Sequence, residues 1–360
     1  MHFLVVGDWI ARFLLAFVFP SRICNRIREN VAPPPIYILA SQTFVDSNAN
    51  TNATMTLIEG VFTTIMFDLA LFGTDNIVIN TIIRYFTKFQ NRWDRPFASP
   101  QVATLAITQF CRALHIQTNP WIWDRPIEEY SCLNDFFARK YSPDYCMEIG
   151  NAEIVSPACC NMRYYFNDDM LRSILVKGCE YSIDKIGLPS DHGCWAGNDS
   201  SITVSKEKYG MNPIFLGYLS PTDYHRVHSP ARGRCIHCCL EGPKSLSSSV
   251  KFFGGRFNIL NENTRLIIVL ETGERKEDMA KARIALIIIG GVGVNTIIYD
   301  RNQLMGRMLE KGEEVASFRA GGSAIAIYST HPMKVTPDFQ AGLNHSSHIK
   351  VMMGEPIANL

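Results

Sequence analysis

The chain of 360 residues is 47% hydrophobic and 19% charged, with a formal net charge of +1. This composition is typical of a globular protein with a large core, and the length favours two domains. The balanced charge, and the lack of a basic stripe interleaved with aromatic residues, exclude an ordinary nucleic-acid-binding surface, so we expect no nucleic-acid partner. The eleven cysteines are scattered, which favours reduced thiols over a secreted disulfide framework.

Residues 1–30 predict an amphipathic helix. Apolar side chains recur at helical spacing from Phe3 to Phe17, whereas Asp8 and Arg12 lie on another face. These charges make the segment too polar for a transmembrane helix, which needs about 20 apolar residues. Three arginines between residues 22 and 28 favour an anionic lipid surface. We therefore expect a peripheral or monotopic helix on an intracellular membrane. The alternatives are a surface helix packed on the protein's own core and a signal anchor.

The length and spacing of the apolar segments change along the chain. Residues 56–73 and 76–89 are two further apolar segments of helical length, so the N-terminal third is predicted to be helix-rich. From about Ser131 onward, short apolar runs are separated by Gly, Pro, Asn and Asp, a pattern typical of a β-rich domain. The predicted fold class is therefore α+β.

Four polar side chains come close together in the stretch LGYLSPTDYHRVHSP, namely Asp223, His225, Arg226 and His228. Two histidines three residues apart suit acid and base chemistry, because the ordinary imidazole pKa lies near neutral pH. Two histidines and a carboxylate also suit a metal site, and histidines at the end of a strand are often purely structural. The spacing alone leaves these three interpretations open.

A second cluster consists of side chains that can bind zinc, namely Cys235, His237, Cys238 and Cys239. It lacks the separated second pair of ligands that a tetrahedral zinc site needs. We therefore expect no metal here.

Near the C-terminus, Gly321, Gly322 and Ser323 precede the apolar run AIAIY. One interpretation is structural, because glycine and serine are common in the loop before a strand. The other is chemical: the Ser323 hydroxyl attacks the preceding carbonyl, which glycine leaves uncrowded. Both interpretations fit these residues taken alone.

The stretch LSPTDYHRVHSP resembles the signature of phosphatidylserine decarboxylases, and further segments resemble that family in the same order along the chain. They are CLNDFFARKYSP at 132–143, IVSPA at 154–158, VKGCEYSIDKIGL at 176–188, FNILNENTR, GGVGVNTI and KGEEVASFRAGGS. The resemblance covers about residues 106–360. It implies an antiparallel β-rich catalytic domain there, after a helix-rich, membrane-associating region at 1–105.

The resemblance implies that the chain cleaves itself between Gly322 and Ser323. Ser323 would become a pyruvoyl group, so no external cofactor and no metal are needed. His228 would act as the base that activates Ser323, because a serine hydroxyl is a weak nucleophile without one. The C-terminal fragment would stay bound to the rest of the protein.

The mature enzyme would convert phosphatidylserine into phosphatidylethanolamine. By resemblance, His225 donates the proton that replaces carbon dioxide. Arg226 is a candidate ligand for an anionic group of the lipid headgroup, with a structural ion pair as the alternative. A lipid substrate also implies that the protein docks on a membrane surface.

The sequence departs from the family pattern where the aspartate that orients the base is expected. Cys159 stands in that place. Two substitutes are available in the sequence, a Cys159 thiolate beside an imidazolium or the carboxylate of Asp223. The alternative function is a processing-deficient homologue that binds lipid or a partner without catalysis.

Overall fold

The computed structural model describes most of the C-terminal two thirds of the chain and two short stretches before it. The described residues are 36–38, 43–45, 94, 96–114, 116, 122–145, 147–165, 174–176, 179–181, 214–220, 222–242, 263–272, 282–290, 297–319, 323–346 and 348–360. The three predicted N-terminal helices lie outside these residues. So do Gly321 and Gly322.

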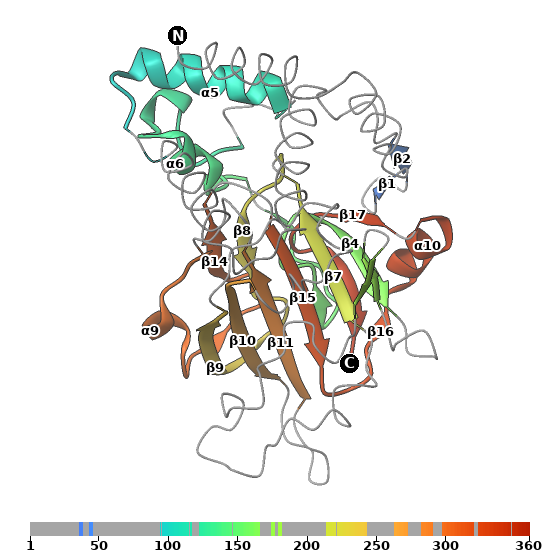
Figure 1. Cartoon of the computed structure of the whole chain (residues 1–360). Helices are drawn as coiled ribbons and strands as arrows, with labels where there is room; N and C mark the ends of the chain where they lie inside the picture. Colours follow the sequence, from blue (N-terminus) through green and yellow to red (C-terminus); the bar gives the residue numbers. More distant parts are fainter. Residues whose placement is uncertain are drawn as a thin grey trace, which may run out of the picture.

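A ten-stranded sheet dominates the fold (Figure 1). Its strands follow the order β13-β9-β10-β11-β15-β7-β4-β17-β1-β2, and every pair of neighbours is antiparallel except β17 and β1. The strands are β1 (Ile36–Ile38), β2 (Thr43–Val45), β4 (Cys160–Tyr165), β7 (Ile214–Leu219), β9 (Gly233–Glu241), β10 (Arg265–Thr272), β11 (Ala282–Ile289), β13 (Met308–Leu309), β15 (Ser323–Ser329) and β17 (Ile349–Val351).

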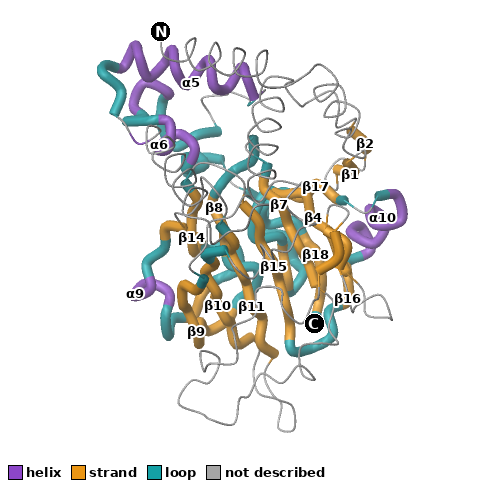
Figure 2. The backbone as a smooth tube through the Cα atoms, in the orientation of Figure 1, coloured by secondary structure: helices purple, strands orange, loops and turns teal. Residues whose placement is uncertain are grey.

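Three smaller sheets accompany the large one. They contain β12 (Ile297–Ile298), β14 (Glu314–Phe318) and β8 (Arg226–His228); β16 (Lys334–Val335), β18 (Pro356–Asn359) and β3 (Ile154–Val155); and β5 (Ile174–Val176) with β6 (Cys179–Tyr181). The described helices lie at the periphery (Figure 2) and are α5 (Pro100–Leu114), α6 (Leu133–Phe137), α9 (Arg301–Leu304), α10 (Pro337–His345) and a 3₁₀ turn at Ile127–Glu129. The predicted α+β class, with an antiparallel β-rich core, is confirmed.

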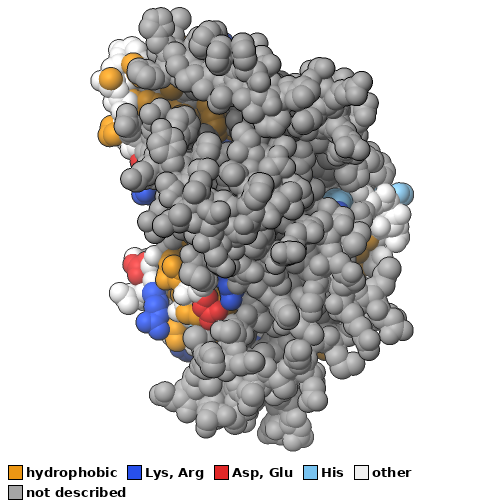
Figure 3. Space-filling model, viewed as in Figure 1, with side chains coloured by type: hydrophobic (Ala, Val, Ile, Leu, Met, Phe, Trp, Pro, Cys, Tyr) orange, Lys and Arg blue, Asp and Glu red, His pale blue; other side chains and the backbone are white. Residues whose placement is uncertain are grey.

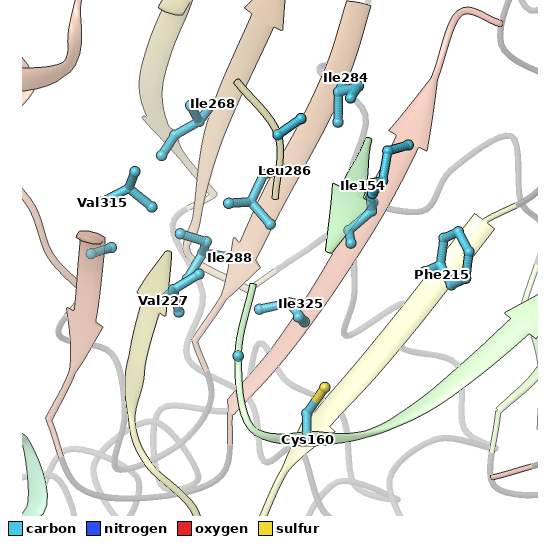
Figure 4. Packing of buried hydrophobic residues seen from close by; sticks show 14 of the residues in the cluster. Ile154, Cys160, Phe215, Val227, Ile268, Ile284, Leu286, Ile288, Val315 and Ile325 are labelled. Atoms are coloured by element: carbon cyan, nitrogen blue, oxygen red, sulfur yellow. The ribbon is translucent and has the colours of Figure 1, made fainter. Parts of the chain in front are cut away.

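The short apolar runs of the sequence became strands because both of their faces are buried. All seven residues of β15 and the last six of β11 are buried. Side chains from neighbouring strands meet in one core, in which Ile268, Leu286, Ile288 and Ile325 lie close together (Figure 4). Burial of this apolar surface holds β15 in the middle of the sheet.

Glycine permits a close approach of three strands at Gly217 in β7. A Cβ atom added there would lie 2.7 Å from Cys160 Sγ and 2.8 Å from Ile325 Cγ1. These two side chains come from β4 and β15, the two neighbours of β7 in the sheet. A glycine is therefore required for the strand next to β15 to pack as it does.

The helices α5 and α6 form a separate small cluster at one end of the sheet (Figure 1). Ile107 and Cys111 of α5 pack there with Tyr130 and Phe136. On the outer side, Val102 and Leu105 are exposed, and Figure 3 shows hydrophobic side chains in this part of the surface. Within the part of the chain that the structure describes, no helix is long and apolar enough to cross a membrane.

Two short stretches of the N-terminal region are strands. β1 pairs with β17, and β2 continues the sheet beyond it. The N-terminal region thus adds an edge to the sheet of the predicted catalytic domain. The domain boundary between residues 105 and 106 stays a prediction.

Candidate active site

Ser323 is the first residue of β15 and is fully buried. In the antiparallel pairing of β15 with β7, it lies opposite Leu219, the last residue of β7. The chain leaves β7 through a turn at Ser220–Asp223 and soon enters β8. This short connection brings the histidine motif to the start of β15.

His225 is the histidine that contacts Ser323. Its Nδ1 lies 3.2 Å from Ser323 Oγ, and its Nε2 lies 3.0 Å from the carbonyl oxygen of Ser220. Because a carbonyl oxygen can only accept, Nε2 carries the proton and donates it to Ser220. Nδ1 therefore presents its lone pair to the Ser323 hydroxyl. This is the tautomer that a general base needs.

The position of the His225 ring is fixed from two sides. The ring of Phe137 stacks on it, with 3.9 Å between centroids and 25° between planes. The Ser220 carbonyl that accepts from Nε2 also accepts from the backbone N–H of Asp223 at 2.9 Å. The side chain of Asp223 in turn accepts from the Ser220 N–H at 2.8 Å through Oδ2. Oδ1 of the same carboxylate is paired with Lys350 Nζ.

The ring of His228 contacts the Gly312 carbonyl and the Tyr224 hydroxyl. Its Nδ1 donates to the carbonyl oxygen of Gly312 at 2.8 Å, so its Nε2 accepts from the hydroxyl of Tyr224 at 3.2 Å. Burial lowers the pKa of His228, which favours the neutral ring. In this structure the Ser323 hydroxyl contacts His225 Nδ1, and the assignment of the base to His228 stays a prediction.

The comparisons with known proteins identify the family of the chain. The sequence model described as phosphatidylserine decarboxylase matches residues 133–359, which is more than half of the chain. This chain belongs to the phosphatidylserine decarboxylase family.

Relatives in this family are distant in sequence. A phosphatidylserine decarboxylase proenzyme of Fusobacterium nucleatum is 28% identical over 276 residues, which cover 76% of this chain and 84% of the relative. Proteins of the same name from Ruminiclostridium cellulolyticum and Bacillus thuringiensis are 25% and 24% identical, over 73% of this chain and 81% and 89% of the relatives. The family is thus established along nearly the full length of the relatives.

Cys159 packs against Tyr224 and Met353, and its polar contacts are with Tyr141 and Met353. The backbone N–H of His228 donates to the Pro157 carbonyl, which places the segment that contains Cys159 next to β8. Cys159 Sγ lies 3.7 Å from the Tyr141 hydroxyl and accepts from the Met353 N–H at 3.4 Å. Burial raises the pKa of the Cys159 thiol, so the neutral form is favoured over the thiolate that the sequence suggested as a substitute.

The other predicted substitute, Asp223, contacts neither histidine ring directly. Its carboxylate reaches His225 only through the Ser220 turn. It thus belongs to the Ser323 site through this turn, and its predicted role as a substitute for an orienting aspartate stays a prediction.

Arg226 takes part in an ion pair, and its predicted contact with the lipid headgroup stays a prediction. Its Nε donates to the carbonyl oxygens of Ala138 and Arg139 at 2.8 and 3.2 Å, and its Nη1 is paired with Glu314. It also lines a polar cavity of about 720 Å³ together with Lys140, Arg307 and Arg319. Each of these three arginines has a carboxylate partner.

The cysteine and histidine cluster on β9 lies away from this site. His237 Nε2 and Cys239 Sγ are 2.9 Å apart, and Cys235 Sγ donates to the His237 carbonyl. Among the described residues, no three or more His, Cys, Asp or Glu side chains are arranged to hold a metal ion.

Sequence reasoning missed four contributors to the site: Ser220, Phe137, Tyr224 and Lys350. The first three lie inside the motifs that carry the family resemblance, so their position in the sequence was a usable signal. Lys350 lies 127 residues from its partner Asp223, and nothing in its surroundings in the sequence marks it.

Proposed function

We propose that this protein is a phosphatidylserine decarboxylase that matures by breaking its own Gly322–Ser323 peptide bond. The family membership and the names of the relatives support the reaction. The observation that carries the proposal is the contact of 3.2 Å between Ser323 Oγ and His225 Nδ1, because it joins the nucleophile to a base in the correct tautomer.

His225 supports the first step of self-cleavage. As Nδ1 takes the hydroxyl proton, Ser323 Oγ bonds to the carbonyl carbon of Gly322, and the C–N bond to the Ser323 nitrogen breaks to give an ester and a free amine. Elimination then removes the Cα proton of residue 323, releases the Gly322 carboxylate and leaves dehydroalanine at residue 323. Water adds to that residue, ammonia leaves, and a ketone remains. The first fragment would end at Gly322 and the second would begin at residue 323.

The surroundings of Ser323 fit a pyruvoyl group made from it. The residue is buried at the head of β15, between β7 and β11, where bulk water is excluded. The carbonyl groups of pyruvoyl supply the electron acceptor that a carboxylate needs to leave as carbon dioxide. The contact with His225 would hold residue 323, the first residue of β15, close to the Nδ1 atom of the imidazole. A proton on that atom would be available for the carbon that loses carbon dioxide.

His228 receives a supporting role in this proposal. Its neutral ring links the Gly312 carbonyl to the Tyr224 hydroxyl, and Tyr224 stacks on Tyr141 with centroids 4.1 Å apart. Since the proposed acid and base work both fall to His225, one imidazole would first remove a proton and later return one. A larger loss of self-cleavage in His228→Gln than in His225→Gln would instead support His228 as the base.

The proposed substrate is phosphatidylserine at the surface of a membrane. The exposed Val102 and Leu105 on α5 support docking on lipid, because apolar side chains on an amphipathic helix bind the boundary of a bilayer. The predicted interface helix at residues 1–30 would add to this attachment, and an intracellular membrane stays the proposed location.

Intact-mass measurement of the purified full chain tests the proposal. The 40.6 kDa chain should give two fragments, 1–322 and 323–360, whereas the Ser323→Ala variant should stay in one piece. The processed protein, mixed with vesicles that contain phosphatidylserine, should release carbon dioxide and form phosphatidylethanolamine. A wild-type chain that stays uncut after long incubation, and that releases no carbon dioxide, would instead identify a processing-deficient homologue.

A further inference from the structure

We infer that the ion pair between Asp223 and Lys350 positions His225 for its reaction with Ser323, acting through the turn at Ser220. The inference rests on the proposed function, because it assigns a role in the same site. Neither residue contacts Ser323. Both are therefore positioning residues, and the contacts between them and the nucleophile can be followed atom by atom.

The first step joins the carboxylate to the imidazole. The Ser220 carbonyl accepts from two donors, the Asp223 N–H at 2.9 Å and His225 Nε2–H at 3.0 Å. The Asp223 side chain closes the same turn from the other side, because Oδ2 accepts from the Ser220 N–H at 2.8 Å. A rotation of the Asp223 carboxylate would therefore move the carbonyl that fixes the tautomer of His225.

The second step ties the carboxylate to the sheet. Each oxygen of Asp223 has its own partner, the Ser220 N–H for Oδ2 and Lys350 Nζ for Oδ1. Lys350 lies on β17 opposite Asn161 of β4, and Asn161 lies opposite Tyr218 of β7. Lys350 thus reaches from two strands away to hold the turn that follows β7.

The burial of the pair makes its geometry specific. The exposed fraction is 8% for the Asp223 side chain and 22% for that of Lys350. Burial alone lowers the pKa of Lys350, but Asp223 together with the nearby Cys159 and Cys160 raises it overall, so the ammonium form is retained. A buried charge that loses its partner is strongly unfavourable. Removal of either residue would therefore force the turn to rearrange.

The pair also spans the proposed cleavage site. Asp223 and His225 belong to the piece that ends at residue 322, whereas Lys350 and residue 323 belong to the piece that begins there. The ion pair that orients His225 before cleavage would therefore also hold the two fragments together afterwards.

The tautomer of His225 tests this inference, because a purely structural ion pair would not control it. In the uncut Ser323→Ala chain, ¹⁵N spectra of the histidine rings, with His225→Gln used to assign the signal, should show His225 with its proton on Nε2. The variants Lys350→Met and Asp223→Asn, made in the same background, should give a mixture of tautomers. Lys350→Arg keeps the positive charge and should retain the Nε2–H form. Lys334→Met is the matched control, because this lysine is exposed on β16 of the same C-terminal piece.

Self-cleavage of the chain with Ser323 intact gives the second readout. Lys350→Met should slow the first-order rate of cleavage at least about tenfold, but less than the about 10⁴-fold loss seen when the orienting group of a serine-protease triad is replaced, because the Ser220 carbonyl remains. Lys350→Arg should restore most of the rate. If Lys350→Met does not fold, Lys350→Gln replaces it, since its amide still donates to Asp223 without a charge.

The outcomes separate this inference from the proposed function. An unchanged tautomer in Lys350→Met and Asp223→Asn, or wild-type cleavage in both, overturns the positioning role even if the protein is an active decarboxylase. A wild-type chain that never cleaves overturns the proposed function. The spectra of the uncut chain then still decide whether the ion pair sets the tautomer.

Discussion

At the scale of single residues, the assignment of the base depends on which histidine faces Ser323. His225→Gln should slow self-cleavage by about 10²- to 10⁴-fold, the usual contribution of a general base. His228→Gln should have a smaller effect, because its ring contacts Gly312 and Tyr224 instead. The rate is measured by intact mass over time, with His237→Gln as a control on β9. The reverse order of effects would return the role of base to His228.

A variant of Cys159 tests whether its thiol takes part in self-cleavage. Cys159→Ser should leave the rate of self-cleavage unchanged, because the neutral thiol provides no charge and a hydroxyl can also accept from the Met353 N–H. The measurement is the same intact-mass time course, accompanied by the thermal unfolding midpoint to exclude a loss of folding. A large loss of rate in a folded variant would show that the thiol replaces the family's aspartate.

The residues of the site were only partly accessible from the sequence. Ser323 and His225, which the structure brings into contact, could be picked out as candidates because the motifs that contain them are ordered along the chain. The choice between the two histidines could not, because it depends on which carbonyl each ring meets, Ser220 for His225 and Gly312 for His228. Such contacts depend on the folded backbone and leave no pattern in the sequence.

At the scale of elements, β7 supports the site through Gly217. Gly217→Ala should lower the free energy of unfolding by about 1–3 kcal/mol, the usual cost of an extra methyl group in a packed core. The new Cβ would meet Cys160 Sγ and Ile325 Cγ1. Urea unfolding in the Ser323→Ala background measures the change. The double variant with Cys160→Ala should lose less than the sum of the two single variants, and strict additivity would contradict the close contact.

The strands were predicted best where they are buried on both faces. The runs that became β10, β11 and β15 are almost continuously apolar, so their type followed from composition alone. The short β1 and β2 were missed, since three residues carry no periodic signal. Pairing partners such as β15 with β7 depend on contacts about a hundred residues apart in the sequence, which periodicity does not encode.

At the scale of the whole molecule, the buried His228 and the partly buried His237 link stability to pH. Burial lowers the pKa of both His228 and His237 from the ordinary value of 6.5, so the folded protein keeps them neutral while the unfolded chain binds protons. Their contribution to stability is complete above about pH 6.5 and is lost as the pH falls below that value, by at most about 1.4 kcal/mol per pH unit for each proton.

Urea unfolding of the Ser323→Ala chain between pH 7.5 and 5.5 measures this effect. The free energy of unfolding should fall toward the acid end, and His228→Gln should make the curve flatter because one of the two neutral histidines is gone. His345→Gln is the control, since His345 is an exposed residue at the end of α10. A His228→Gln curve parallel to that of the parent would show that this ring is not held neutral by the fold.

The central place of β15 in the sheet has a consequence for the lifetime of the mature protein. Antiparallel ladders to β7 and β11 hold this strand on both sides, so a cut at its first residue would leave a short peptide firmly bound. Before the cut, refolding is a reaction of one molecule. After it, two molecules must meet, and recovery would depend on concentration. If the processed enzyme were denatured and then diluted, its two fragments would thus not reassemble. Its lifetime would be set by its rate of unfolding.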